Sequence, residues 1–378
     1  MTTSFISDAA TTNTSLPLAK VDALIDGVDA GFWGFDLASK YGFPRQGAPY
    51  SGDLVKDLQA GAGAYGDGAI VQASGQSLGY VGKMLDFSDL TYRNSYVQGP
   101  ASVLAGIWGT GSGATATAAL SGSTAVVTVT AGGAAYVAGK ATAVFIGGGL
   151  ANGVTVSSAC TVVGGAVTAV ASPAATFTSA PTVVIVPSPQ LWLWCGYYKL
   201  PTNADWNAET SNGNRFPLFQ CSNDDQSFGT DADMLAVLQQ TDKTLRFAKQ
   251  GYAAQGVTLA ITPATPDYGA VCQLAAWATP SGFFVRLKRL ETGAAAISTS
   301  WTTTVAPNSL NFAAKTPKFG PAGAYALKSG GVWSTAQQAA SNFKVGRGFI
   351  ENLGITGRDP IGVLDADWER TLARAVYS

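Results

Sequence analysis

The sequence predicts an all-β fold, an antiparallel β-sandwich that ends in one short helix. Its apolar stretches are short, and many alternate with polar residues or are apolar on both faces, as in QLWLWCGYYKL from Gln190 and GFFVRLKRLETG from Gly282. Clusters of Gly, Pro, Asn and Asp separate these stretches, which is typical of strands joined by turns. Only the closing segment DADWERTLARAVYS has helical periodicity, with Asp365 as its expected N-cap.

The middle of the chain differs in composition from both flanks. Between Gly109 and Pro189 the only charged residue is Lys140, whereas 12% of the whole chain is charged. We expect three parts: an anchoring N-terminal arm over 1–30, a discontinuous β-sandwich domain over 31–108 plus 190–378, and an inserted Gly/Ala/Thr/Val-rich β-repeat domain over 109–189. Because insertions are tolerated where chain ends meet, Trp108 and Gln190 are predicted to lie close together.

The uncharged block contains a weak internal repeat with a period of about 40 residues. One copy begins at Gly113 and the other at Gly153, and each has two alternating Thr/Val strands, an aromatic residue and a closing strand. The aromatic residues are Tyr136 and Phe177. Strands so poor in charge promote aggregation at a free edge, so the edges are either closed within the block or covered by a partner. The block is therefore a module that packs against neighbouring copies, or an ordinary insertion with a Thr-rich surface.

The absence of histidine limits the chemistry of the chain. It excludes Ser-His-Asp and Cys-His nucleophiles and His-based zinc sites, and leaves carboxylate pairs and Lys or Tyr bases. The cysteines have no metal-binding spacing, so we expect all four to be free and buried: Cys160, Cys195, Cys221 and Cys272. We expect no catalytic residues and no cofactor other than calcium at the acidic loop described below.

Charge and hydropathy restrict the partners and the location. A net charge of −1 gives no reason to expect nucleic acid or an anionic membrane surface as a partner. No apolar run is long enough to cross a bilayer, and the opening MTTSFISDAATTNTSLPLAK lacks the basic and apolar regions of a signal peptide. We therefore expect synthesis in the cytoplasm and no membrane insertion.

The N-terminal arm is rich in Thr, Ser and Ala. Leu18, Val21, Leu24 and Ile25 would share one face of a short helix. We expect the arm to lie against a partner subunit; the alternative is a terminus without fixed contacts.

Three stretches resemble segments of the concanavalin A-like (laminin-G-like) jelly-roll domains of tailed-bacteriophage virion proteins. They are GYYKLPTNADW from Gly196, VCQLAAWATPSGFFVRLK from Val271 and GRGFIENLGITGRDPIGVLDADWER from Gly346. The earlier DFSDLTYRNSYVQGPASVLA resembles the opening strands of such domains, and GATATAAL, GGAAY and TSAPTVVIV resemble small β modules of phage tail and fibre proteins. The resemblance implies two curved antiparallel sheets, a structural role in the virion and, in some members, glycan binding.

The loop CSNDDQSFGTDAD from Cys221 is the candidate metal site. Its carboxylates could supply oxygen ligands to calcium, as in many laminin-G-like domains: Asp224, Asp225, Asp231 and Asp233. The spacing is not that of an EF-hand, and a solvated turn is the favoured interpretation.

Aromatic residues form the candidate carbohydrate site. Trp192, Trp194 and Tyr198 share one face of a predicted strand and could stack on sugar rings, although aromatic residues in strands more often belong to the core. Trp206, after a Pro-containing turn, is expected to be exposed. Glu351, near Arg347 and Arg358, is expected to form a structural ion pair.

The sequence thus favours a non-enzymatic structural component of a tailed phage particle. It would be a tail, baseplate, neck or fibre protein, or a capsid decoration protein, and a homo-oligomer with a trimer favoured. It would contact other virion proteins through its arm. The alternatives are an adhesin that binds a host-surface glycan and a polysaccharide-degrading enzyme that uses a carboxylate pair.

Overall fold

The computed structural model describes most of the chain. The described residues are 22–28, 30–59, 64–88, 95–101, 103, 111–139, 141–150, 155–186, 191–208, 215–221, 234–239, 243–249, 257–279, 282–291, 293–301, 316–322 and 342–377. Trp108, Gln190, Leu18 and Val21 lie outside these residues, so the predicted approach of the first two and the helix face of the last two are not described.

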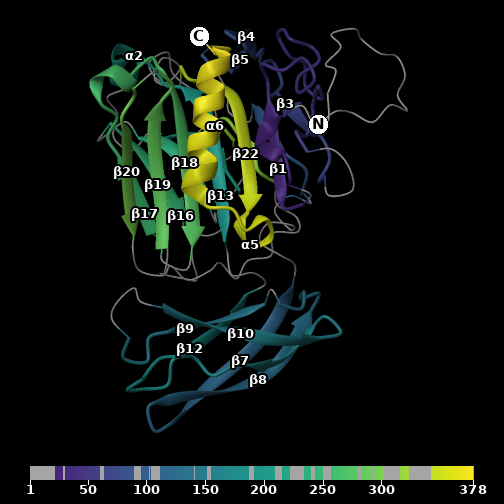
Figure 1. The fold of residues 1–378 in the computed structure, drawn as a ribbon, viewed down its shortest axis with the longest axis vertical. Coiled ribbons are helices and arrows are strands. Elements are labelled where there is room, and N and C mark those ends of the chain that lie inside the picture. The colour runs from purple at the N-terminus through teal and green to yellow at the C-terminus, as the bar shows by residue number, and fades with distance from the viewer. Residues whose placement is uncertain are drawn as a thin grey trace, which may run out of the picture.

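Two large antiparallel sheets lie face to face (Figure 1). The first runs in the order β20 (Ala296–Trp301), β19 (Gly282–Arg289), β18 (Val271–Thr279), β13 (Trp192–Lys199), β22 (Lys344–Asn352), β5 (Met84–Asp86) and β4 (Gly79–Val81), and β1 (Phe32–Asp36) also pairs with β22. The second runs in the order β17 (Val257–Ile261), β16 (Thr244–Lys249), β15 (Met234–Gln239), β14 (Arg215–Gln220), β21 (Lys318–Phe319), β6 (Tyr96–Gln98), β3 (Gly68–Val71) and β2 (Leu54–Val55). The predicted all-β sandwich is confirmed.

Strand β13 shows why several runs are apolar on both faces. Trp192 and Trp194 point into the core between the sheets, where Trp194 lies 5.0 Å from the ring of Phe219 on β14. The alternate residues Leu193 and Cys195 belong to a second core on the outer face of the first sheet. Because side chains alternate along a strand, a strand covered on both sides must be apolar at every position.

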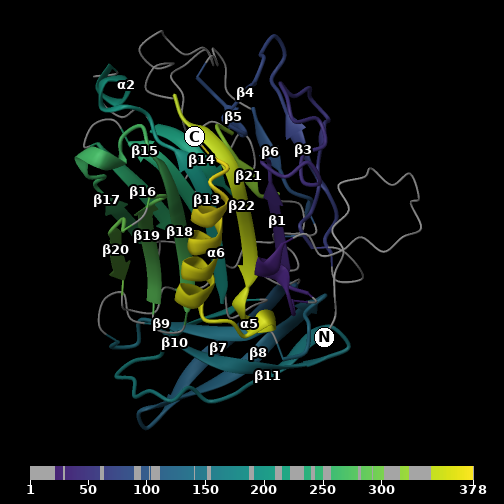
Figure 2. The same ribbon diagram turned by 45° about the horizontal axis from the view of Figure 1, so that its top comes forward.

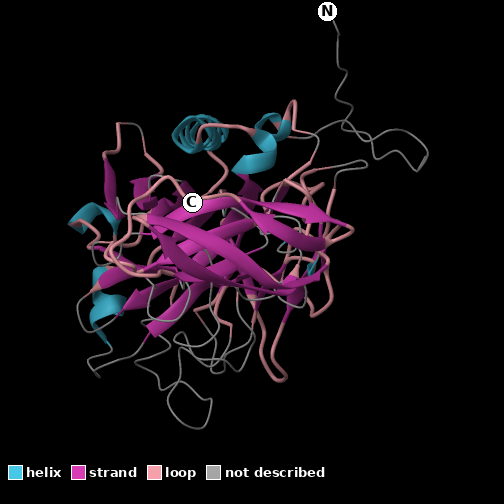
Figure 3. Cartoon of the chain, turned by 90° about the horizontal axis from the view of Figure 1, so that it is seen from below, coloured by secondary structure: helices cyan, strands magenta, loops and turns pink. Residues whose placement is uncertain are grey.

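The C-terminal helix covers that outer face. Helix α6 (Pro360–Arg374) follows the short α5 (Leu353–Thr356) and buries Val363 and Leu364 against the first sheet. Figure 3 shows α6 nearly end-on beside the strands. The helix begins earlier than predicted, because Asp359 is the N-cap and Pro360 is the first residue of the helix. Asp365 instead binds Arg286 and Lys288 of β19.

The other helices among the described residues are short: η1 (Ala23–Ile25), α2 (Asn203–Ala208) and η3 (Thr265–Asp267). Within the described ranges, no helix has the length and apolar character needed to cross a membrane. The described end of the N-terminal arm packs on its own sandwich, with Leu24 and Ile25 buried in the second core.

Six strands form a separate β-module at one end of the sandwich (Figure 2). They are β7 (Ser112–Ser121), β8 (Thr124–Ala134), β9 (Thr142–Ile146), β10 (Thr155–Val163), β11 (Ala166–Val170) and β12 (Thr182–Val186). They pair in the orders β11-β10-β9-β12 and β7-β8, and β8 also lies beside β11 and β7 beside β12. The edges of the two sheets therefore meet within the module, which protects them from pairing with other chains.

The internal repeat corresponds to a duplicated three-stranded unit. Strands β7, β8 and β9 correspond to β10, β11 and β12, and Tyr136 and Phe177 occupy equivalent places in one hydrophobic core. The backbone amide of Tyr136 donates to the carbonyl of Gly165 at 2.9 Å. The backbone amide of Phe177 donates to the carbonyl of Ser123 at 2.8 Å. Each aromatic residue thus closes the hairpin turn of the other copy.

Candidate functional site

The four aromatic residues of the predicted carbohydrate site are core side chains. Trp192, Trp194, Tyr198 and Trp206 are each at most 1% exposed. Tyr198 donates its hydroxyl to the carbonyl of Leu218 at 2.7 Å, and Trp206 lies edge-on to Tyr268 at 5.4 Å. Side chains this deeply buried cannot stack on a sugar, so the expected platform on β13 and the expected exposure of Trp206 are corrected. The second sheet covers the inner face of β13, and local sequence does not reveal that cover.

The predicted metal ligands Asp224, Asp225, Asp231 and Asp233 lie outside the described residues. Among the residues that the structure does describe, no group of three or more Cys, Asp or Glu side chains is arranged to hold a metal ion. All four cysteines are free and buried, as predicted.

Glu351 is enclosed in a structural ion pair. It is 0% exposed, and its Oε1 accepts from the Thr356 hydroxyl at 2.5 Å and from Arg358 Nε at 2.8 Å. Its Oε2 accepts from Arg358 Nη2 at 2.7 Å. Both oxygens are therefore engaged, and the predicted ion pair is formed by Arg358 alone, because Arg347 binds other carboxylates.

Arg347 lies at the centre of a buried charge cluster between the first sheet and α6. The guanidinium binds Asp22 at 2.6 Å, Asp36 at 3.2 Å and Asp367 at 3.0 Å. Two more arginines balance the carboxylates: Arg370 binds Asp22 and Asp367, and Arg374 binds Asp36. The cluster joins the N-terminal segment, β1, β22 and α6. Because Arg347 is 0% exposed, the cluster is a structural ion-pair network that holds these segments together and is not a binding site.

The cluster also sets the protonation of its carboxyl groups. Burial is the largest single influence on Asp22 and Asp36 and by itself raises their pKa. The positive charges of Arg347 and of the neighbouring arginines, together with hydrogen bonds, outweigh burial and hold both pKa values below the ordinary 3.8. Hydrogen bonds from Arg347 to Asp22 and from Arg374 and Tyr377 to Asp36 act in the same direction. Both groups are therefore charged at neutral pH.

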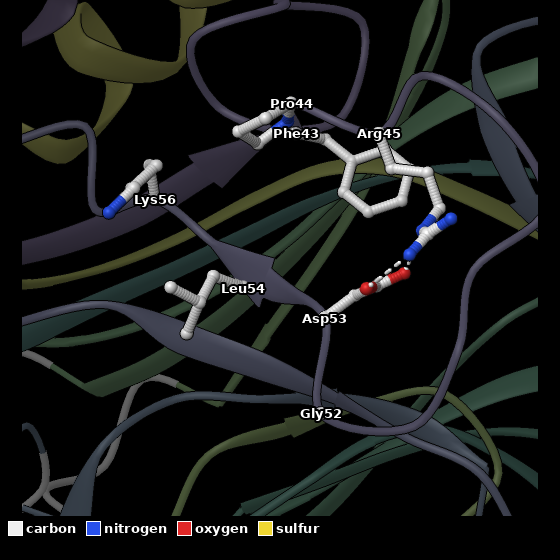
Figure 4. Close-up of a pocket in the computed structure, with 7 residues that line it drawn as sticks. All are labelled: Phe43, Pro44, Arg45, Gly52, Asp53, Leu54 and Lys56. Carbon is white, nitrogen blue, oxygen red and sulfur yellow. Dashed lines mark hydrogen bonds and ion pairs between the residues drawn. The ribbon is translucent and has the colours of Figure 1, made fainter.

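An open groove of about 600 Å³ lies where β2 forms the edge of the second sheet (Figure 4). Arg45 and Asp53 form a two-point ion pair on one side, and Leu54 and Lys56 come from the strand and its end. The Arg45 guanidinium lies 4.3 Å from the ring centre of Tyr50, which is 67% exposed. The sequence does not reveal this group, because its members are ordinary loop residues that come together only when the loop folds.

The exterior of the β-module is the other candidate surface. Its described residues, 111–139, 141–150 and 155–186, include no charged side chain. On the hairpin of β7 and β8, Thr115, Thr117, Thr128 and Thr130 are exposed, and the hydroxyls of Thr115 and Thr130 lie 2.7 Å apart. Val126 is 50% exposed on the same hairpin. The result is a neutral surface of short side chains.

Neither a scan against protein-family models nor a search of curated proteins finds a match. Among solved structures, the chain is similar to the receptor-binding domain of botulinum neurotoxin type G, at 7% identity over 48% of this chain and 38% of that one, with a TM-score of 0.30. It is also similar to the CBM2 module of the evolved Dit of Lactobacillus casei BL23 phage J-1, at 12% identity over 44% and 63%, with a TM-score of 0.25.

A third similar structure is the CBM40 domain of the Ruminococcus gnavus IT-sialidase, at 9% identity over 47% of this chain and 82% of that one, with a TM-score of 0.29. The chain thus spans less than two thirds of the first two of these structures. TM-scores this low carry no functional inference.

Proposed function

We propose that the chain is a non-enzymatic structural component of a tailed phage particle, made in the host cytoplasm and assembled as an oligomer. The resemblance of its sequence segments to virion jelly-roll domains and fibre modules supports this role. The observation that carries it is the neutral exterior of the β-module. The tail, baseplate, neck, fibre and capsid surface are all places for such a protein, and the N-terminal arm would contact other virion proteins.

The exterior of the module favours contact between copies of the chain. A solvated protein surface is usually about 25–35% charged, and a neutral surface associates readily. Short Thr, Ser and Ala side chains allow two backbones to approach closely at little cost in side-chain entropy. Because the strand edges meet within the module, copies would pack face to face and not by adding strands. A trimer is the expected oligomer.

Two features support the absence of enzyme activity. The chain has no histidine to act as a general base. Glu351, which the sequence places near two arginines, is buried with both oxygens occupied, so it is closed to substrate. Assays for reducing-sugar release from polysaccharides test this part of the proposal, and release above the level of a heat-denatured sample would contradict it.

Light scattering coupled to size-exclusion chromatography tests the assembly. The full chain should elute as an oligomer, and the pair Thr117→Lys with Thr128→Lys should dissociate it, because these exposed residues face each other across β7 and β8. Ser300→Lys, at an exposed position of β20 on the sandwich, is the matched control and should leave the oligomer intact. A wild-type monomer, or an oligomer unaffected by the charged pair, would contradict the proposal.

The place of the chain in a particle requires a separate measurement. Mass spectrometry of purified particles should find the chain at a fixed copy number, and antibody labelling in electron micrographs should locate it on the tail or capsid. Absence of the chain from intact particles would contradict a virion role.

A further inference from the structure

A short strap, residues 56–59, leaves the end of β2 and runs beside β1. The amide of Lys56 donates to the carbonyl of Gly42 at 2.8 Å, and the amide of Leu58 donates to the carbonyl of Gly34 on β1 at 2.8 Å. The side chain of Leu58 is 2% exposed and belongs to the second core, on the outer face of the first sheet. The strap therefore joins an edge strand of the second sheet to β1 of the first.

The strap also holds the N-terminal segment 22–28. The side-chain amide of Gln59 donates to the carbonyl of Val28 at 3.2 Å, and these residues are 2% and 5% exposed. Leu58 lies in the same hydrophobic core as Leu24 and Val28. Movement of the strap would therefore take away one hydrogen bond and one apolar neighbour from this segment.

Asp57 is the buried polar centre of the strap. It is 3% exposed, and its Oδ1 accepts from the amides of Gly34 at 3.3 Å and Gln59 at 3.1 Å. Its own amide donates to Oδ1 of Asp67 at 3.2 Å. Its Oδ2 has no hydrogen-bond partner among the described residues. The carboxyl group thus connects the strap to β1, while one of its oxygens is buried without compensation.

The groups around Asp57 supply no cation to balance its charge. Lys56, on the strap itself, binds Asp67 at 2.6 Å. On β1, Asp36 is bound by Arg347 and Arg374, and its charge is balanced there. Burial raises the pKa of Asp57 to about 7, the charge of Asp67 acts in the same direction, and the backbone hydrogen bonds oppose both. The titratable groups on the elements that pack around the strap are Tyr41, Lys56, Tyr65, Asp67, Asp36, Asp22 and Asp26.

We propose that loss of the Asp57 proton to water opens the strap and loosens segment 22–28, so that this part of the N-terminal arm is held more tightly in acid than in alkali. A buried carboxylate without a cation is costly, and opening lets water solvate it. The closed strap keeps its proton up to about pH 7, whereas the open strap loses it near the ordinary 3.8. Stability of the closed strap is therefore lost as the pH rises between these values. This switch does not depend on the structural role proposed above.

Hydrogen exchange of the full chain between pH 5 and pH 9 tests the proposal. Each rate is divided by the rate of an unstructured peptide at the same pH, which gives a protection factor. In peptides that cover 22–28 and 56–59, protection should fall at least about tenfold from pH 5 to pH 8 and then stay level. In Asp57→Asn the protection should not change with pH, because an amide does not ionise. The matched control is Asp26→Asn, at an exposed position of segment 22–28, which should keep the wild-type pH dependence.

Local opening must also be separated from unfolding of the whole sandwich. Peptides of the strap and of segment 22–28 should exchange faster than peptides of the core strand β13 at every pH, because they open without it. The proposal is overturned if protection does not depend on pH, if Asp57→Asn keeps that dependence, if the strap responds but segment 22–28 does not, or if both exchange only as slowly as β13. The wild-type profile alone can overturn it, so the test stands even if the variant fails to fold.

Discussion

Asp57 is a buried carboxyl group, and no cation of the described part of the chain balances its charge. It is 3% exposed, and its Oδ1 accepts from the amides of Gly34 at 3.3 Å and Gln59 at 3.1 Å. No partner for its Oδ2 is found among the described residues. Burial raises the pKa of Asp57 from its ordinary 3.8 to about 7, against the opposing effect of the backbone hydrogen bonds. The contrast with Asp22 and Asp36 shows that a nearby arginine, and not burial alone, decides the charge of an aspartate in this protein.

Asp57→Asn should stabilise the protein most at high pH. Between about pH 4 and 7 the folded chain holds a proton that the unfolded chain releases, so the free energy of unfolding of the wild type falls as the pH rises through this range. Each unit of pKa shift corresponds to about 1.4 kcal/mol, so the variant should gain on the order of 2–4 kcal/mol at pH 8 relative to pH 4. Urea unfolding at several pH values measures this difference. The exposed Glu369→Gln serves as control, and identical pH profiles for Asp57→Asn and wild type would contradict the prediction.

At the scale of elements, the Arg347 cluster fastens the N-terminal segment to the C-terminal helix. Asp22 binds both Arg347 and Arg370, and its Oδ1 also accepts from the amide of Leu24 at 2.9 Å. The segment 22–28 is therefore held by an ion pair as well as by the burial of Leu24 and Ile25. Stability from Asp22 is present above the ordinary Asp pKa and is lost as the pH falls through its lowered pKa.

Asp22→Asn should loosen this segment without unfolding the sandwich. Loss of the charge removes two ion pairs, and hydrogen exchange of the amides in 22–28 should become at least about tenfold faster, the equivalent of about 1.4 kcal/mol. Acid below the lowered pKa should have the same effect on the wild type. Asp26→Asn, at an exposed position of the same segment, should not change the exchange. Equal protection in Asp22→Asn and wild type would show that apolar contacts alone hold the segment.

In the β-module, the two copies of the repeat share one hydrophobic core, and each is hydrogen-bonded to the hairpin turn of the other. Phe177 is 2% exposed, lies 6.1 Å from Phe145 and bonds through its amide to the turn of the first copy. Tyr136 is 5% exposed and bonds in the same way to the turn of the second copy. Neither copy can close its own hairpin turn by this bond, so the two copies should fold together.

Phe177→Ala and Tyr136→Ala should therefore destabilise the whole module by similar amounts. Removal of a buried aromatic side chain costs about 3–5 kcal/mol. Hydrogen exchange followed by mass spectrometry should show faster exchange in strands of both copies for either variant, with the sandwich unchanged. Val126→Ala, at a half-exposed position, is the control and should change little. If Phe177→Ala affects only β10, β11 and β12, the copies are independent.

For the whole molecule, the strands of the module and of the sandwich form no common sheet within the described chain. Their hydrophobic cores are also separate clusters. We therefore expect that replacing 109–189 by a short Gly/Ser linker leaves a soluble sandwich with near wild-type stability, but without oligomer formation. Circular dichroism, thermal unfolding and light scattering would measure this. An insoluble product, or a large fall in melting temperature, would mean that the module belongs to the sandwich core.

The local structure of much of this chain can be predicted from its sequence. Alternation along short runs indicated strands, the final segment indicated a helix, and the repeat placed Tyr136 and Phe177 in equivalent positions. These features depend on neighbouring residues, so they can be recognised without the fold. The prediction failed where distant segments meet. Nothing in the local sequence shows that a sheet covers Trp192 and Trp194, or that Asp22, Asp36, Arg347 and Asp367 converge from four elements. Burial and charge pairing depend on distances through space, so they follow from the tertiary structure and not from the local sequence.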